Sequence, residues 1–267
     1  MKVISKIYTV LIFVFLYAPI AVLIAFSFNS TKSRAVFSGF TFKWYESLFQ
    51  NSEIFKAILV TLQVAIVASI LSTILGVIAA VIISKSSKKV GALFSNVTNF
   101  PMLNPEIVMG VSLMMLFVFL SGIFSFLSMG VVTLILAHTT FCTPYVMLNV
   151  LPKLRQSDNS MYEAAIDLGC TPVKAFLKVV FPDVKPAVIT GAIMAFTISI
   201  DDFVISYFTS GTVQNLSITI YSMTRKLVTP EINALSTILF VAVLLLLVVI
   251  NIRQTQEEKR RGAVKKC

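Results

Sequence analysis

Charged residues are scarce in this sequence of 267 residues: Asp, Glu, Lys and Arg together make up only 13% of it. A soluble globular domain carries about 25% charged residues. Hydrophobic residues make up 57%, and the mean hydropathy is +0.91. The shortage of charge argues against a soluble enzyme, and the 22 phenylalanines argue against a disordered chain. The composition therefore predicts an all-α integral membrane protein whose residues 1–267 form a single domain with several spans.

Cysteine is also scarce, and the common catalytic motifs are missing. Cys142, Cys170 and Cys267 are scattered and form no C-x-x-C, so they predict neither a disulfide framework nor a zinc site. The phosphate-binding pattern G-x-x-x-x-G-K-[ST] is absent, as are H-E-x-x-H and G-x-S-x-G. An intramembrane aspartyl protease would need two aspartates on different helices, whereas Asp201 and Asp202 are neighbours. We therefore expect a chain with no catalytic centre, cofactor or metal of its own.

The apolar stretches predict six membrane-spanning helices. Residues 107–152 contain no Asp, Glu, Lys or Arg and a single histidine, His138, and are too long for one span of about 20 residues. They should form two helices separated by a turn between residues 121 and 130. The six expected spans are residues 7–28, 57–84, 101–121, 129–150, 187–208 and 233–252.

The basic residues predict how these spans are oriented. The net charge is +10, and most of the 22 Lys and Arg residues lie in the segments on one side of the predicted spans. Loops rich in Lys and Arg remain in the cytoplasm. This rule places both termini, the connection 85–98 and the loop 151–186 in the cytoplasm. The basic residues are then explained by the lipid bilayer, and they predict no nucleic-acid partner.

Two features inside the predicted spans have ordinary packing explanations. A stripe of small residues follows one face of the second span at helical spacing, which favours close packing of helices, with a role in lining a pathway as a compatible alternative. The stripe consists of Ala65, Ser69, Ser72, Gly76 and Ala79. His138 has no second metal ligand nearby in the sequence, so we expect a hydrogen-bonded packing histidine.

The predicted cytoplasmic loop, residues 151–186, has the pattern of a folded element. Residues 161–169 indicate a short helix that Gly169 closes in the left-handed conformation. Thr171-Pro172 indicates the start of a second helix, which we expect to end at Pro182 and Pro186. Such a helix–glycine–helix unit on the cytoplasmic face is suited to docking another protein, although a purely structural role is an equal alternative.

This loop also resembles the EAA motif of binding-protein-dependent ABC importer permeases. The residues that carry the resemblance are Glu163-Ala164-Ala165, then Gly169, then Val179-Val180-Phe181-Pro182. Where Val179 and Phe181 stand, the family pattern has Ile and Leu. The resemblance implies the type I permease fold and a coupling helix that contacts the ATP-binding subunit through Glu163, Ala164, Ala165, Gly169 and Pro182.

The resemblance also implies partners and a location. These are a second homologous permease, two copies of an ATP-binding subunit that holds ATP and magnesium, and an extracytoplasmic polyamine-binding protein, assembled in a bacterial inner membrane. Four further segments are similar to permeases of spermidine and putrescine importers: residues 42–49, 104–108, 199–203 and 222–237. A permease for polyamines is therefore the leading hypothesis, and import of thiamine or an iron complex is the alternative.

Acidic residues are the candidates for contact with a cationic substrate. A carboxylate inside a span costs about 2.5–3.5 kcal/mol, so Asp201 and Asp202 in the fifth predicted span need an explanation. Neighbouring residues of a continuous helix point about 100° apart, so we expect one to line the pathway and the other to pack, with a structural pair as the alternative. Tyr207 and Phe208 could add cation–π attraction.

Glu106 is the remaining acidic candidate for the pathway. It follows Asn104-Pro105, a pattern typical of a helix start, where the helix dipole favours an acid. A helix-terminal role is therefore the plainer interpretation. A stand-alone channel or secondary carrier is a further class; it would predict internal repeats or broken helices, and the sequence indicates neither.

Overall fold

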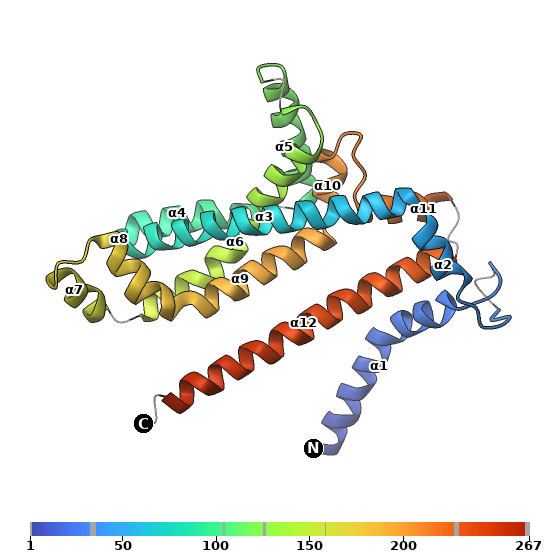
Figure 1. Ribbon diagram of the computed structural model, residues 1–267, viewed down its shortest axis with the longest axis horizontal. Coiled ribbons are helices and arrows are strands. Elements are labelled where there is room, and N and C mark those ends of the chain that lie inside the picture. Colours follow the sequence, from blue (N-terminus) through green and yellow to red (C-terminus); the bar gives the residue numbers. More distant parts are fainter. Residues whose placement is uncertain are drawn as a thin grey trace. The chain divides into compact units, whose positions relative to one another are not determined.

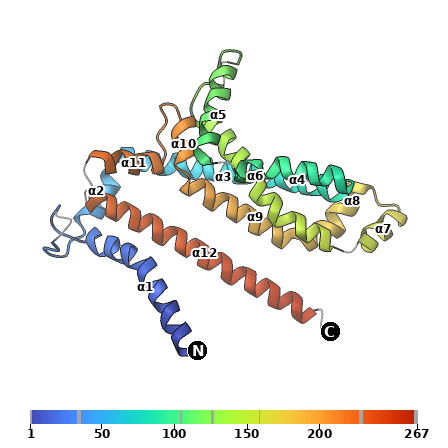
Figure 2. The same ribbon diagram turned by 180° about the vertical axis from the view of Figure 1, so that it is seen from behind.

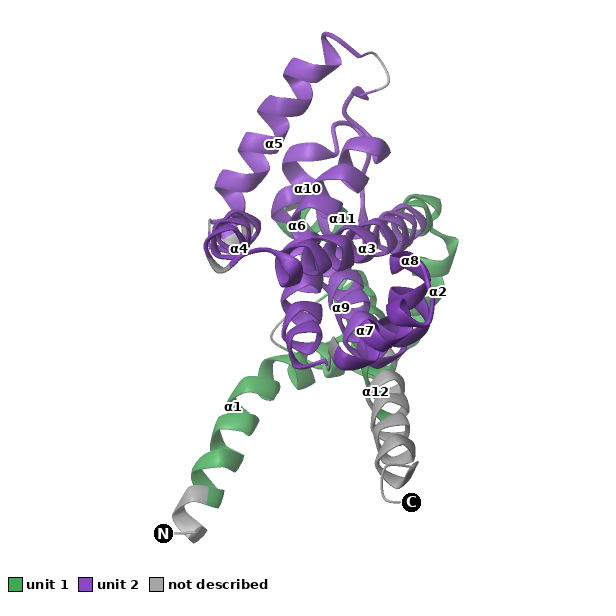
Figure 3. Cartoon of the chain, turned by 90° about the vertical axis from the view of Figure 1, so that its left-hand side faces the viewer, with its two compact units in different colours: residues 1–56, 219–267 green, residues 57–218 purple. Residues whose placement is uncertain are grey.

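The computed structural model describes residues 2–32, 36–103, 105–124, 127–157, 159–226 and 230–264. Over these ranges the regular secondary structure is helical, apart from an isolated β-bridge between Asn29 and Phe40. It divides into two compact units, residues 1–56 with 219–267 and residues 57–218 (Figure 3). The all-helical prediction is confirmed.

The unit of residues 57–218 contains most of the helices. Helix α6 packs lengthwise on α9, while α5 packs on α10 at the end of α9 that lies away from α7 and α8 (Figure 1). The elements are α3 (Ser52–Lys85) from residue 57 on, α4 (Lys88–Leu103), α5 (Glu106–Ser121), α6 (Val131–Gln156), α7 (Asn159–Asp167), α8 (Pro172–Ala175), the π-helical turn η2 (Phe176–Val180), α9 (Phe181–Asp201) and α10 (Val204–Thr209). Helix α11 (Leu216–Lys226) begins in this unit and continues in the other.

Glycine allows close helix packing in the core of this unit. A Cβ atom on Gly76 of α3 would lie 2.7 Å from Val146 Cβ, and one on Gly191 of α9 would lie 3.1 Å from Val146 Cα. Both helices therefore approach α6 more closely than a side chain would allow. The small-residue stripe on α3 is buried except for the partly buried Ala79, as the packing interpretation predicts.

The other unit combines α1 (Lys2–Ser27), α2 (Lys43–Gln50) and α12 (Pro230–Val264). Helix α12 packs on α1 and α2, and α1 and α12 approach each other near α2 (Figure 2). The segment after α1 is held by specific bonds: the indole nitrogen of Trp44 donates to the carbonyl of Asn29 at 2.7 Å, and the hydroxyls of Ser27 and Tyr45 lie 2.7 Å apart. Ser47 donates to Glu231 at 3.3 Å.

Four helices of the described chain are long and apolar enough to cross a membrane: Lys6–Ser27, Ser52–Lys85, Val131–Gln156 and the continuous run Pro172–Asp201. Two shorter apolar helices, Glu106–Ser121 and Pro230–Leu245, overlap the expected third and sixth spans. The expected third span, residues 101–121, is divided because α4 ends at Leu103 and Pro105 precedes α5. The connection 85–98, which was expected as a link, contains most of α4.

The prediction that Pro182 and Pro186 end a separate helix is wrong. Helical structure continues from Pro172 to Asp201. The wide turn η2 precedes the prolines, with the N–H of Phe181 donating to the carbonyl of Phe176, five residues back. Pro182 follows this wide turn directly, as the second residue of α9, and helical structure continues past it although a proline supplies no backbone donor.

The fifth expected span, residues 187–208, is also not continuous. Helix α9 ends at Asp201, and Asp202 adopts an extended conformation with φ −66° and ψ 122°. Helix α10 then begins at Val204. The expectation of unbroken helices is therefore wrong at this point, and so is the argument that placed Asp201 and Asp202 about 100° apart on one helix.

Candidate functional site

The EAA residues lie on the short helix α7. Gly169 has φ +86°, its N–H donates to the carbonyl of Ile166 at 2.8 Å, and the N–H of Cys170 donates to that of Ala165 at 3.0 Å. This pair of bonds is the Schellman ending of a helix, so the predicted role of Gly169 is confirmed. No atom would lie within 4 Å of a Cβ at Gly169, so the position requires glycine for its backbone angle alone.

Helix α7 presents an apolar face to solvent. Met161 is 64% exposed and Leu168 is 86% exposed, and Ala164 between them is also exposed. These residues are three and four positions apart, so they share one side of the helix. Val173 in α8 adds a further exposed apolar side chain. Exposed apolar surface of this kind is typical of a protein interaction site.

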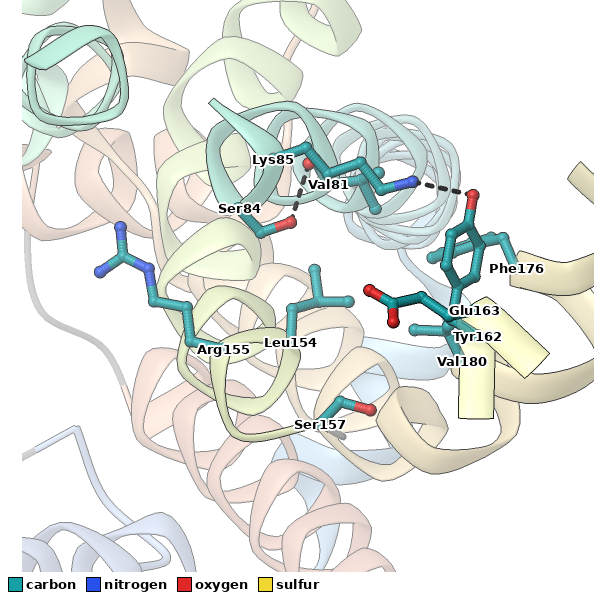
Figure 4. Close-up of a pocket in the computed structure, with 10 residues that line it drawn as sticks. All are labelled: Val81, Ser84, Lys85, Leu154, Arg155, Ser157, Tyr162, Glu163, Phe176 and Val180. Atoms are coloured by element: carbon teal, nitrogen blue, oxygen red, sulfur yellow. Dashed lines mark hydrogen bonds between the residues drawn. The ribbon is translucent and has the colours of Figure 1, made fainter. Parts of the chain in front are cut away.

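A pocket of about 470 Å³ lies beside α7, where it meets the ends of α3 and α6. The Glu163 carboxylate points into it (Figure 4). The Lys85 ammonium donates to the Tyr162 hydroxyl at 3.2 Å and lies 4.5 Å from the ring centroid. The lining residues are Val81, Ser84, Lys85, Leu154, Arg155, Ser157, Tyr162, Glu163, Phe176 and Val180. Helix α7 and the turn η2 therefore face the ends of α3 and α6 across this pocket.

The second candidate site is the break between α9 and α10. Asp202 is only 8% exposed, and its carboxylate accepts from the backbone N–H of Ser206 at 2.9 Å and of Ile205 at 3.4 Å. These bonds satisfy the free N–H groups at the start of α10, so Asp202 acts as a helix cap. Asp201, in contrast, is exposed. The structure thus separates two neighbouring carboxylates that the sequence could not distinguish.

A buried polar cluster surrounds the break. His138 of α6 is 1% exposed; its Nδ1 lies 2.7 Å from Ser199 Oγ, and its Nε2 lies 2.9 Å from Ser206 Oγ. The amide of Asn215 also donates to Ser206 Oγ, at 2.7 Å. The prediction of a hydrogen-bonded packing histidine is confirmed. Within the described ranges, no group of three or more His, Cys, Asp or Glu residues could hold a metal ion.

The other predicted pathway residues are placed as follows. Tyr207 of α10 is 50% exposed and its ring centroid lies 5.5 Å from that of Phe203. Phe208 packs on α5 so closely that a Cβ on Gly110 would lie 2.8 Å from it. Glu106 is exposed in the first turn of α5, as the helix-start interpretation expects, while Asn104 lies outside the described residues. Pro182 is exposed at the start of α9.

Sequence reasoning missed the partners of His138. Ser199, Asp202 and Ser206 are spaced three and four residues apart, a spacing that places polar groups on one helical face. That spacing was the available signal for a polar cluster around His138. Asn215 and the contact between Lys85 and Tyr162 join segments too distant in the chain for any local pattern to indicate them.

Comparison with known proteins gives a consistent result. The family described as "Binding-protein-dependent transport system inner membrane component" matches residues 72–262. The putrescine transport system permease protein PotI of Escherichia coli (strain K12) is 39% identical over 234 residues, covering 86% of this chain and 83% of that protein. The spermidine/putrescine transport system permease protein PotC of Haemophilus influenzae is 37% identical over 238 residues, covering 89% and 91%.

The fold also has a solved counterpart. The crystal structure of a bacterial ABC transporter involved in the import of the acidic polysaccharide alginate contains a chain that superposes with a TM-score of 0.74. That chain is 15% identical, and the match covers 96% of this chain and 95% of the other. At this identity the likeness concerns the fold.

Proposed function

The chain belongs to the family of inner-membrane components of binding-protein-dependent transport systems, and on this premise we propose that it is a permease subunit of an ATP-driven polyamine importer. The observation that carries the proposal is its identity of 37–39%, over most of its length, to permeases of putrescine and spermidine/putrescine transport systems. These relatives favour polyamines over thiamine or an iron complex. The chain is a transport component of the inner membrane, and hydrolysis of ATP is assigned to a separate subunit.

We propose that the chain crosses the membrane six times with both termini in the cytoplasm. Four long apolar helices and two shorter ones support the number of spans, and the distribution of Lys and Arg supports the orientation. Helix α1 supports contact with lipid or with a second permease subunit, because none of its most apolar window is buried inside this chain.

Helix α7 is the proposed contact with the ATP-binding subunits, two copies of which would serve a pair of permeases. Glu163, Ala164, Ala165, Gly169 and Pro182 occupy the EAA positions, and all but the half-buried Ala165 are exposed. The apolar face of Met161, Ala164 and Leu168 gives this contact a surface to bury. The Schellman ending fixes the C-terminus of α7, which supports its use as a rigid contact for conformational changes of the ATP-binding subunits.

The translocation pathway is proposed to pass the break between α9 and α10. A polyamine carries several positive charges, so a path through a low dielectric requires fixed acids or aromatic faces. Asp201 is the exposed carboxylate at the break, and Tyr207 is the half-exposed aromatic residue one helix later. Asp202 is assigned to the cap, Phe208 to packing on α5 and Glu106 to the start of α5. An extracytoplasmic polyamine-binding protein would deliver the substrate.

Uptake of radiolabelled putrescine and spermidine by cells with and without this gene tests the proposal. The expected result is uptake that depends on the gene and is not reduced by excess thiamine or ferric citrate. Uptake of labelled thiamine that depends on the gene, with no effect on polyamines, would contradict the proposed substrate while leaving the family unchanged. Polyamine uptake unaffected by loss of the gene, in cells that have no second polyamine importer, would also contradict it.

A further inference from the structure

One side chain connects the two sides of the helix break. The imidazole of His138 contacts Ser199, which precedes the break on α9, and Ser206, which follows it on α10. Its Nε2 also lies 3.6 Å from the Asp202 carboxylate. Helix α6, which carries His138, is continuous past this point. Helix α6 thus contacts both halves of the broken helix through this ring, and its Thr133 makes a further bond to the Thr209 carbonyl of α10 at 2.8 Å.

The surrounding bonds allow two arrangements of protons with the same partners. Ser206 Oγ accepts from Asn215, whose carbonyl oxygen in turn accepts from the N–H of Ile218 at 3.0 Å. The Ser206 proton can be directed to the carbonyl or carboxylate of Asp202, at 3.1 and 3.2 Å. With the Ser206 proton on Asp202, Nε2 of His138 donates to Ser206 and Nδ1 accepts from Ser199; with that proton on Nε2, the two roles are reversed and the partners stay the same. Each ring nitrogen therefore has one defined partner on one side of the break.

Non-helical backbone at membrane depth is tolerated only where its polar groups are satisfied by protein or water. At this break Asp202 satisfies the start of α10, and the histidine bridge, together with the bond from Thr133 to the Thr209 carbonyl, holds α10 relative to α9. Ser199, Ser206 and His138 are each at most 2% exposed, so water does not compete with these bonds. Asp201 and Tyr207 stand on the two segments that the bridge holds together.

We propose that His138 is a positioning residue for transport: by bonding Ser199 and Ser206, it sets the geometry of the break and thereby the placement of Asp201 and Tyr207. Its contribution to transport rests on the function proposed above, whereas its effect on the break does not. His138 need not touch the substrate, since it is buried and its ring nitrogens are occupied.

A distance measurement tests the effect on the break directly. Nitroxide labels at Met194 of α9 and Tyr207 of α10, which are 41% and 50% exposed, report the distance across it in a chain whose three native cysteines are replaced. We expect a narrow distribution in this parent and a broadened one in His138→Asn, whose short amide can reach Ser199 but not Ser206. His138→Gln, whose longer amide can reach Ser206 but not Ser199, should also broaden it, because each amide keeps only one arm of the bridge.

Two further variants keep this test decisive. Ser199→Ala removes one arm of the bridge and leaves the Asp202 cap intact, so it should broaden the distribution even if the His138 variants fold poorly. Thr139→Val is the matched control, because Thr139 is the buried neighbour of His138 but bonds only its own helix, at the carbonyl of Ile135. An unchanged distribution in both His138→Asn and Ser199→Ala, or equal broadening in Thr139→Val, overturns the proposal.

Uptake by the full transporter, reconstituted with its partner subunits, tests the link to transport. His138→Asn should lower putrescine uptake about fivefold to tenfold, the size expected for loss of one buried hydrogen bond. If His138 acts through Asp201, adding His138→Asn to Asp201→Asn should cause little further loss. Full additivity contradicts the link through Asp201. Normal uptake by Asp201→Asn alone contradicts the proposed pathway, and the distance measurement still decides the role of His138.

Discussion

The ammonium group of Lys85 lies 3.2 Å from the hydroxyl oxygen of Tyr162, which connects the end of α3 to the helix that carries the EAA residues. The contact is exposed at Lys85, and exposed cation–π or polar contacts contribute about 0.5–1 kcal/mol. The contact between Lys85 and Tyr162 therefore contributes little to stability, and its main effect is to hold α7 in one orientation beside the pocket that Glu163 enters.

Loss of this contact should weaken coupling modestly. We expect Tyr162→Phe, which keeps the ring and removes the hydroxyl, to lower transport per ATP hydrolysed by about twofold, in line with a contact of less than 1 kcal/mol. Lys85→Met should have a similar effect, and the double variant should be no worse than either. Lys89→Met is the control, since Lys89 is exposed on α4. Equal loss in the control would show a general effect of surface charge.

Gly169 should be intolerant of any side chain. An alanine at φ +86° costs about 1–2 kcal/mol, because its Cβ would approach the following carbonyl group. Gly169→Ala should remain inserted in the membrane but lose most stimulation of the ATPase, and Gly169→Asp should lose all of it. Glu163→Lys should also abolish coupling. Gly122→Ala is the control, because Gly122 has φ −68° and a Cβ there would make only an ordinary van der Waals contact, 3.4 Å from the Phe119 carbonyl oxygen.

Normal transport by both Gly169→Asp and Glu163→Lys, measured as uptake alongside membrane content, would contradict the assignment of α7 as the docking helix. If Gly169→Asp or Glu163→Lys is instead lost from the membrane, the defect is one of folding. ATPase stimulation by the milder variant Gly169→Ala then decides whether α7 is the docking helix.

The two aspartates should respond differently to substitution. Asp201→Asn should lower polyamine uptake while the complex still assembles, because it removes an exposed charge and little packing. Asp202→Asn should be close to normal, since an amide oxygen also caps a helix, whereas Asp202→Ala should destabilise the chain by about 1–2 kcal/mol. Uptake and thermal stability of the purified complex measure both effects. The reverse pattern would move the pathway from Asp201 to Asp202.

Reporter fusions test the membrane orientation. Fusions after Ser86 and Gln156 should report the cytoplasm, and one after Thr212 should report the outside, since an odd number of spans separates it from the N-terminus. A fusion after Gln156 that reports the outside would place the EAA loop where no ATP-binding subunit can reach it.

Much of the fold could be predicted from the sequence because the membrane imposes strong composition rules. The apolar stretches located the helices, and the pattern around Gly169 predicted both the helix and its ending. The continuous helix through Pro182 and Pro186 could not be predicted, because the π-helical turn that precedes these prolines has no clear local signature. Helix α4 was missed because it contains polar residues and stands between two predicted spans.

The candidate site was predicted only in part. Asp201 and Asp202 were found because charge inside an apolar stretch is conspicuous, and Tyr207 because it follows them. Their separate roles depend on the extended conformation of Asp202, which turns its carboxylate into the start of α10. That conformation is supported by His138 from another helix, and such support over a distance of more than 60 residues leaves no trace in local spacing.

The most direct test of the central claim is ATP-driven accumulation of radiolabelled putrescine in vesicles that contain this chain together with its partner permease, ATP-binding subunit and substrate-binding protein. The account predicts accumulation that requires ATP, is blocked by excess spermidine and is lost with Glu163→Lys although the complex still assembles. Accumulation that proceeds without ATP, or that persists unchanged when this chain is omitted, would contradict it.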